Sequence, residues 1–272
     1  MVYHEIAPSP DLAPYIRCLW MLEDQQSDGS RPLQKVMPDA CPELIIHYGD
    51  RFRIREKGKI RLQPYAFLFG PISRHIEIGP SGSTGMVALR FYPGALSAFI
   101  PFSVKDITNC YIPLNKAFGR DAKPLEASVR KAGSMEERFL LLESFLRSRL
   151  QVAKPFVPVL KQQTLKQITD QQYPVKIEEL SKQLNIGRRH LERKFNEQFG
   201  MTPRQFLKIV RFQNIFRIIG AKRVKNLTDL TYRAGYFDQS HFYRDFKEFA
   251  NMSPKEYFKE DAGLTKLFVA SL

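Results

Sequence analysis

The sequence is poor in cysteine and has no long hydrophobic run. Cys18, Cys41 and Cys110 are odd in number and far apart, so they supply neither a disulfide framework nor a paired Cys-x-x-Cys metal site. No stretch approaches eighteen apolar residues, and the amino terminus lacks the basic segment and apolar core of a secretion signal. We therefore expect a soluble protein of the reducing cytoplasm, with no membrane partner, no metal and no cofactor.

Acidic residues are also in short supply. The chain has 28 Asp and Glu against 42 Lys and Arg, a formal net charge of +14. The excess is larger toward the carboxyl end, because residues 163–272 hold 20 basic and 12 acidic side chains whereas residues 1–150 hold 20 and 16. This balance favours a nucleic acid or another anionic surface as the partner.

The 272 residues suffice for two domains, and the pattern changes between them. From Pro38 to about Phe102, short β-branched and aromatic runs broken by Gly and Pro predict antiparallel β structure, either a sandwich or a cupin-like barrel. From Ser134 to Leu150 an apolar stripe at helical spacing predicts a helix. We expect an α+β chain with a first domain over 1–150, a linker over 151–162, an all-α domain over 163–260 and a tail over 261–272.

One segment of the helical part occurs twice. The stretch from Gly187 to Leu207 returns fifty-one residues later, from Asp238 to Phe258. The coincident residues are His190, Arg193, Phe195, Glu197, Met201 and Pro203, which fall on His241, Arg244, Phe246, Glu248, Met252 and Pro254. The repeat predicts two tandem copies of one small helical unit that contact one polyanion at two places.

Each copy has the pattern of two helices joined by a tight turn. Asn185 and Gly235, which tolerate positive φ, occupy aligned positions where the first helix of each copy ends. The copies are fifty residues apart before this turn and fifty-one after it, so we expect one inserted residue in the second turn. Asp238 is expected to cap the second helix of its copy, and a spacer helix is expected from Pro203 to about Ile219.

The second helix of each copy has an apolar face and a polar face. Leu191, Phe195 and Phe199 make the apolar stripe of the first copy, as do Phe242, Phe246 and Phe249 in the second. Hydrogen-bonding side chains at i, i+3, i+4 and i+7 suit the reading of base edges from a helix in the major groove. The opposite face carries Arg189, Glu192, Arg193 and Asn196 in the first copy and Ser240, Tyr243, Arg244 and Lys247 in the second.

These residues resemble the AraC/XylS family of bacterial transcription regulators over about residues 160–260. The second copy is the clearer match, since the G-[FY]-x-D-x-S core appears as Gly235, Tyr236, Asp238 and Ser240. The resemblance implies a tandem helix-turn-helix domain that binds double-stranded DNA. It implies base-facing roles for Arg189, Glu192, Arg193, Gln239, Ser240, His241 and Arg244, and backbone contacts for Arg188, His190, Asn196, Tyr243 and Lys247.

The first half resembles a sensor region that some of these regulators carry, through PDACPELIIHYGD, LFGP and LRFYPGAL. This second resemblance implies a small-molecule or protein effector at residues 1–150, and the family implies RNA polymerase as a further partner. Homodimer formation is left open. The chain departs from the family pattern at Asn185 and Gly187 in the first turn and at residues 212–215 in the spacer. These departures weaken the assignment of DNA contacts to the first copy, but not the assignment of the domain.

Two other features of the first half are of types that bind ligands. Glu43, His47 and His75 are metal-ligand types, but no paired-His spacing joins them, so we expect no metal site. The run RFRIREKGKIR places a basic residue at every second position from Arg51 to Arg61, which predicts a hairpin with one basic face. That face is expected to be solvated, with an anionic ligand or DNA phosphate as the alternative.

The leading hypothesis is a sequence-specific DNA-binding regulator and not an enzyme. One alternative is a DNA-repair methyltransferase that uses the same DNA-binding unit, although it needs a reactive cysteine in a zinc site and the three separated cysteines do not supply the ligands. The other is a nucleoid-type binder without sequence preference, for which the basic run at 51–61 would matter as much as the two helices.

Overall fold

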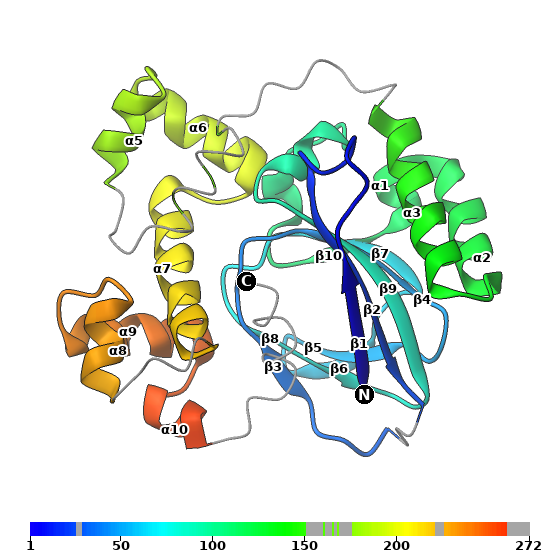
Figure 1. The fold of residues 1–272 in the computed structure, drawn as a ribbon, viewed down its shortest axis with the longest axis horizontal. Coiled ribbons are helices and arrows are strands. Elements are labelled where there is room, and N and C mark those ends of the chain that lie inside the picture. The colour runs from blue at the N-terminus through cyan, green and yellow to red at the C-terminus, as the bar shows by residue number, and fades with distance from the viewer. Residues whose placement is uncertain are drawn as a thin grey trace.

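The first domain is built on two antiparallel sheets (Figure 1). The computed structural model describes residues 1–25, 29–150, 160, 165, 168, 176–220 and 226–259. One sheet has the strand order β1-β2-β9-β4-β7-β10 and the other β3-β8-β5-β6. The strands are β1 (Val2–Ile6), β2 (Ile16–Asp24), β3 (Gln34–Val36), β4 (Glu43–His47), β5 (Phe52–Glu56), β6 (Lys59–Leu62), β7 (Ala66–Phe69), β8 (Ile76–Pro80), β9 (Thr84–Phe91) and β10 (Tyr111–Pro113).

The six-stranded sheet is covered on both faces. Alternate residues of β2 separate the two sides: Leu19 and Met21 join the core beneath the helices, and Trp20 and Leu22 join the core against the four-stranded sheet. Every residue of β9 is buried for the same reason. The covering elements are the short 3-10 helices η1 (Ala95–Ala98), η2 (Val104–Ile107) and η3 (Gly119–Asp121), with α1 (Leu114–Phe118), α2 (Ala122–Lys131) and α3 (Met135–Leu150).

The expected antiparallel β domain is confirmed, as two packed sheets, and the helix expected over 134–150 is present as α3. Ser134 Oγ accepts the backbone N–H of Glu137 at 3.1 Å, which caps that helix. Three strands lie earlier than the sequence suggested, because β1, β2 and β3 precede Pro38. A strand buried on both faces shows no alternation of apolar and polar residues, and β2 has none.

The prediction of a single basic face on the β5–β6 hairpin is wrong. The two-residue turn Lys57-Gly58 pairs Glu56 with Lys59 and Arg55 with Ile60. Directly paired residues share a face, so odd-numbered residues of β5 share a face with even-numbered residues of β6. Arg53 and Arg55 therefore lie on the face opposite to that of Lys59 and Arg61.

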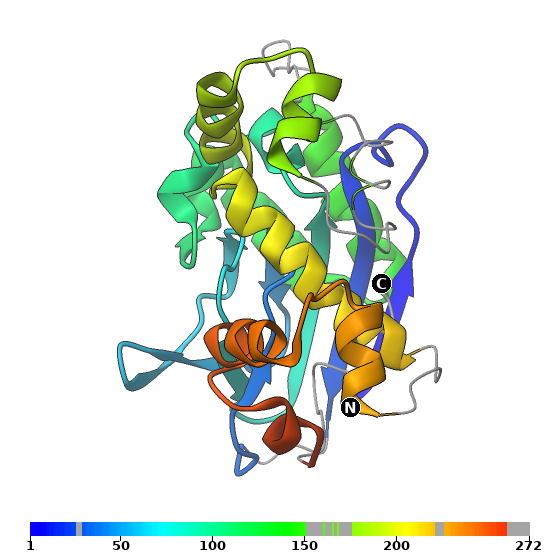
Figure 2. The same ribbon diagram turned by 90° about the vertical axis from the view of Figure 1, so that its left-hand side faces the viewer.

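The helical domain consists of two similar units joined by one long helix, α7 (Pro203–Gly220), which Figure 2 shows running between them. The first unit contains α5 (Ile177–Gln183) and α6 (Arg188–Phe199), and the second contains α8 (Leu227–Arg233) and α9 (Gln239–Ala250), followed by α10 (Pro254–Lys259). Phe206 packs on Phe195 and Phe199 at one end of α7, and Phe212 and Phe216 pack on Phe246 toward the other. Both units thus share one core through α7.

The expected linker over 151–162 lies outside the described residues apart from Leu160, which is buried in the core of the helical domain. The expected tail over 261–272 is outside them as well.

Candidate nucleic-acid interface

The turn of each unit is built in the same way. Asn185 and Gly235 have φ of 51° and 85°, the left-handed conformation that the sequence predicted at both positions. In the first unit Asn185 N donates to Lys182 O at 3.1 Å, and in the second Gly235 N donates to Tyr232 O at 3.0 Å. The second helix then begins at Arg188 in one unit and at Gln239 in the other, so the inserted residue does lie in the second turn.

The repeat continues through the ends of these helices. Gly200 and Asn251, fifty-one residues apart, both take left-handed φ, of 68° and 51°, at the carboxyl caps of α6 and α9. Thr202 caps α7 through Gln205 N at 3.2 Å, and Ser253 caps α10 through Glu256 N at 3.2 Å. The coincident Pro203 and Pro254 are the first residues of the next helices, so this part of the repeat serves the fold.

The helix beginnings differ between the units. Asp238 Oδ1 accepts the backbone N–H of His241 at 2.7 Å, as its predicted role as a cap requires. Gly187 offers α6 no side-chain cap. In α6 the first turn instead carries two exposed arginines, Arg188 and Arg189.

The apolar stripes are buried as predicted, with Leu191, Phe195, Phe242 and Phe246 all at 0% exposure. The polar residues therefore lie on the opposite side of α6 and α9. Among the predicted site residues, those exposed are Arg188, Arg189, His190, Arg193, Gln239, Ser240, Arg244 and Lys247, and those half-buried are Glu192, Asn196, His241 and Tyr243.

Several of these side chains have weak contacts along their own helix. Arg188 pairs with Glu192 at 3.1 Å and Arg193 with Glu197 at 3.9 Å, both one helical turn apart and solvent-exposed. Asn196 Nδ2 donates to Glu192 O at 2.9 Å. Exposed ion pairs contribute little, so the arginines are free to exchange a carboxylate for a phosphate or a base edge.

His241 lies in a different setting from the other predicted base-facing residues. Arg211 Nη2 on α7 donates to His241 Nε2 at 3.1 Å, and the buried carboxylate of Asp245 lies 3.8 Å from the same nitrogen. The ring of Tyr236 packs edge-on against it. These contacts place the His241 side chain between α9 and α7, whereas its counterpart His190 is exposed.

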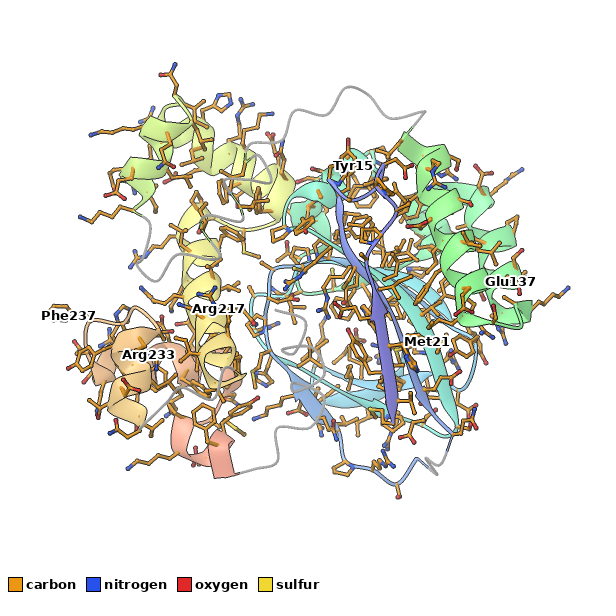
Figure 3. All side chains as sticks on the ribbon, viewed as in Figure 1. Tyr15, Met21, Glu137, Arg217, Arg233 and Phe237 are labelled. Carbon is orange, nitrogen blue, oxygen red and sulfur yellow. The ribbon has the colours of Figure 1, made fainter. Side chains whose placement is uncertain are left out.

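The sequence pattern did not predict a role for Phe237, which is 86% exposed directly before the cap of α9. Figure 3 places it at the edge of the molecule remote from the first domain, which is marked by Met21. Tyr232 of α8 is also 59% exposed. The position of Phe237, between the turn and the capping Asp238, is the feature that would have identified it.

In the first domain the metal-ligand residues do not come together. His47 Nε2 meets Gln63 Oε1 at 3.1 Å inside the sheet core, while His75 Nδ1 meets Phe249 O at 3.0 Å. Glu43 binds Arg90 at 2.8 Å and Trp20 Nε1 at 3.1 Å. Burial raises the pKa of Glu43 and lowers that of His47 to about 4. In the described part of the chain no group of three or more His, Cys, Asp or Glu is placed to hold a metal.

A small cavity lies between the two sheets. It measures about 50 Å³ and is lined mainly by apolar side chains, with the Glu43–Arg90 pair at its wall. Val36 of β3 and Ile76 and Ile78 of β8 also line it.

None of the three cysteines lies in surroundings that activate its thiol as a nucleophile, because burial raises the pKa of each. Cys18 and Cys41 are buried and Cys110 is exposed. Burial raises the pKa of the Cys18 thiol to about 12, the reverse of what a reactive cysteine needs. Among the helices described, none is long and apolar enough to cross a bilayer.

Comparison with known families gives two matches. Residues 180–260 match a family described as a helix-turn-helix domain, and residues 4–113 match one described as a domain of unknown function (DUF6597). The resemblance of the carboxyl-terminal part to AraC-type regulators is thereby confirmed.

The curated relatives match over short stretches of the chain. The HTH-type transcriptional activator RhaS of Escherichia coli strain SE11 is 29% identical over 77 residues, which are 28% of this chain and 27% of that protein. The protein of the same name from Klebsiella pneumoniae strain 342 is 29% identical over 79 residues, or 29% of this chain and 28% of its own length. The chain thus spans about a quarter of the length of the curated relatives it matches.

Among solved structures, ToxT from Vibrio cholerae has a TM-score of 0.48 at 10% identity, covering 92% of this chain and 98% of that one. ToxT from Vibrio cholerae O395 bound to (E)-4-(8-methylnaphthalen-1-yl)but-3-enoic acid has a TM-score of 0.47 at 13% identity, covering 92% and 98%. Both TM-scores are below 0.5.

Proposed function

Since residues 180–260 form a helix-turn-helix domain of the AraC type, we propose that the chain is a sequence-specific DNA-binding transcription regulator. One observation carries the proposal: the same helix-turn-helix occurs twice, and in both copies the second helix buries its apolar face and exposes arginine. The net charge of +14 adds the phosphate attraction that DNA binding requires. In the proposed complex α6 and α9 each enter one of two adjacent major-groove segments.

The side chains suggest distinct roles. Arg189, Arg193 and Arg244 suit the O6 and N7 acceptors of guanine, and Gln239 suits the N6 and N7 edge of adenine. Ser240 and Glu192 are the other base-facing candidates, and Glu192 first has to release Arg188. Arg188, His190, Asn196, Tyr243 and Lys247 are proposed to contact the backbone.

For His241 the surroundings favour an indirect role. Its ring nitrogen is engaged by Arg211, so we assign it to positioning α9 against α7 rather than to direct reading. Phe237 takes a place in the proposed interface instead. An exposed aromatic side chain at the amino end of a recognition helix suits the 5-methyl group of thymine.

The two helices present different residues at equivalent positions. Arg189 corresponds to Ser240, Glu192 to Tyr243 and Asn196 to Lys247. One chain is therefore proposed to read an asymmetric sequence with two unlike half-sites, without needing a second copy for the second half. Contact with RNA polymerase and homodimer formation are further expectations that come with the resemblance.

The first domain is proposed to respond to an effector. The cavity between its sheets has room only for water at about 50 Å³, against roughly 300–1,000 Å³ for a typical small-molecule site. A small-molecule effector at this place would have to part the two sheets, and such a movement is what would transmit its binding.

Selection of bound fragments from random DNA by the purified full-length chain tests the proposal. We expect recovery of one asymmetric motif, bound at least a hundredfold tighter than random duplex at the same salt concentration. A nucleoid-type binder would recover no motif and would show equal salt dependence on selected and random duplexes. That result would contradict the proposed function.

A further inference from the structure

We infer that the first domain positions both recognition helices by capping their carboxyl ends, and so sets the distance between the two DNA half-sites that the chain reads. The inference rests on the proposed function. It concerns side chains of the first domain that contact the carboxyl ends of α6 and α9, namely Lys35, His75, Ser103 and Thr108.

The end of α9 is held by β3 and by the residue before β8. Lys35 Nζ donates to Ala250 O at 3.0 Å. His75 donates twice to Phe249 O, from its backbone N at 3.0 Å and from its ring Nδ1 at 3.0 Å. The last carbonyls of a helix have no partner within the helix, and a cation there is favoured by the helix dipole. The first domain thus satisfies two of these carbonyls at the end of α9.

The end of α6 is held by the region of η2. Thr108 Oγ1 donates to Gly200 O at 2.8 Å, closer than its 3.3 Å approach to Val104 O. A longer contact of 3.4 Å joins Ser103 Oγ to Glu197 O. The surfaces are in close contact here, because a Cβ on Gly94 would lie 2.7 Å from the ring of Phe199.

The two held ends are equivalent in the repeat. Gly200 and Asn251 are aligned carboxyl caps, so the first domain meets the same end of each copy. The opposite ends carry Arg189 and Gln239 and are exposed. The capping contacts therefore leave the proposed DNA face uncovered.

The contacts give the two units a second connection. The first connection is α7, whose 18 residues span about 27 Å. The first domain bridges the same units, and it also meets the middle of α7, where Gln213 donates to Pro38 O. Met37 and Ala40 are buried in the helical core beside it. Two connections restrain the separation and angle of α6 and α9 more tightly than one helix does.

The same strands build the cavity wall and the capping contacts. Val36 and Ile76 line the cavity, and their neighbours Lys35 and His75 hold α9. The end of α6 is held by a different part of the first domain, beyond β9. A shift of β3 and β8 would therefore move α9 relative to α6.

The test measures the spacing preference of the full-length chain. The selected site is synthesised with one base pair removed, unchanged, or with one or two added between its half-sites. The variants are Lys35→Met, which removes the hydrogen bond to Ala250 O at the end of α9, Thr108→Val, which removes the hydrogen bond to Gly200 O at the end of α6, and the double variant. Lys59→Met on the exposed strand β6 and Thr108→Ser, which keeps the hydroxyl, are the matched controls.

We expect the wild type and both controls to lose at least tenfold in affinity when one base pair is added. The ratio of the affinity for the unchanged site to that for the site with one added base pair should fall at least fivefold in the double variant. Each single variant should show part of this fall. This ratio of affinities is the informative quantity, because damage to the fold lowers affinity equally at every spacing. Circular dichroism confirms that each variant is folded.

An unchanged ratio in folded variants would overturn the inference alone. Failure of the wild type to prefer the selected site over random DNA would overturn the proposed function, and the inference with it.

Discussion

Arg211 on α7 and Asp245 on α9 form an ion pair of 2.8 Å that fixes the second recognition helix to the spacer. The same guanidinium reaches His241 Nε2 at 3.1 Å, and Lys208 approaches the Asp245 carboxylate at 3.1 Å. Asp245 is only 1% exposed, so these cations take the place of water around its carboxylate. Arg211 and Lys208 of α7 thus both reach one buried carboxylate of α9.

Replacement of Asp245 by Asn should destabilise the protein. Loss of the charge leaves Arg211 and Lys208 without their buried partner, and we expect the free energy of unfolding to fall by about 2 kcal/mol. Urea denaturation measures it. Glu126→Gln removes an exposed carboxylate 3.9 Å from Arg130 and should change stability by less than about 0.5 kcal/mol. Equal effects of the two substitutions would show that the Asp245 network does not contribute.

His47 should make stability depend on pH. Burial lowers its pKa from 6.5 to about 4, so between these values the unfolded chain binds a proton that the folded chain does not. The contribution is complete above pH 6.5 and is lost as the pH falls toward 4, by about 3 kcal/mol in total. Urea denaturation of the wild type and His47→Gln at pH 7.5, 6.5, 5.5 and 4.5 measures the difference. Parallel profiles would contradict the assignment.

Gly94 should be intolerant of a side chain because of the domain contact. Its φ of +83° is strained for alanine, and an added Cβ would meet the Phe199 ring at 2.7 Å. Gly58 in the β5–β6 turn has a similar φ of +77° with no atom within 4 Å of such a Cβ, so Gly58→Ala isolates the backbone strain. We expect about 1 kcal/mol from strain in both variants and a further 1–3 kcal/mol from overpacking in Gly94→Ala. Equal losses would mean that Phe199 moves aside freely.

Phe237 should discriminate thymine from uracil. If its ring contacts a thymine methyl group, replacing one thymine by uracil in the selected site weakens wild-type binding by about 0.8 kcal/mol, or roughly fourfold. Phe237→Ala should bind both sites equally. Leu62→Ala removes another exposed apolar side chain, on β6, and should keep the discrimination. A Phe237→Ala protein that still separates the two sites would contradict this contact.

The helical domain was predictable because its rules are local. Helical spacing of Phe242, Phe246 and Phe249 and the positive φ at Asn185 and Gly235 follow from a few neighbouring residues. The fifty-residue and fifty-one-residue registers even located the inserted residue correctly.

The contacts between domains were not predictable. Lys35 and Ala250 are 215 residues apart and Thr108 and Gly200 are 92 apart, and each bond ends on a backbone carbonyl that any residue type supplies. The prediction of a single basic face on the β5–β6 hairpin was wrong for another reason. Basic residues do alternate within each strand, as predicted. The length of the turn decides which residues of the two strands share a face, and the two-residue turn Lys57-Gly58 places the basic residues of β5 and of β6 on opposite faces.

The central claim is that α6 and α9 read two different half-sites. The most direct test compares Arg189→Ala and Arg244→Ala on a panel in which every base pair of the selected site is changed in turn. We expect each variant to lose about 1–3 kcal/mol on the unchanged site and to lose base preference at one position only, in opposite halves of the site. Equal losses by both variants on selected and random DNA, with the preference at every position intact, would contradict the account.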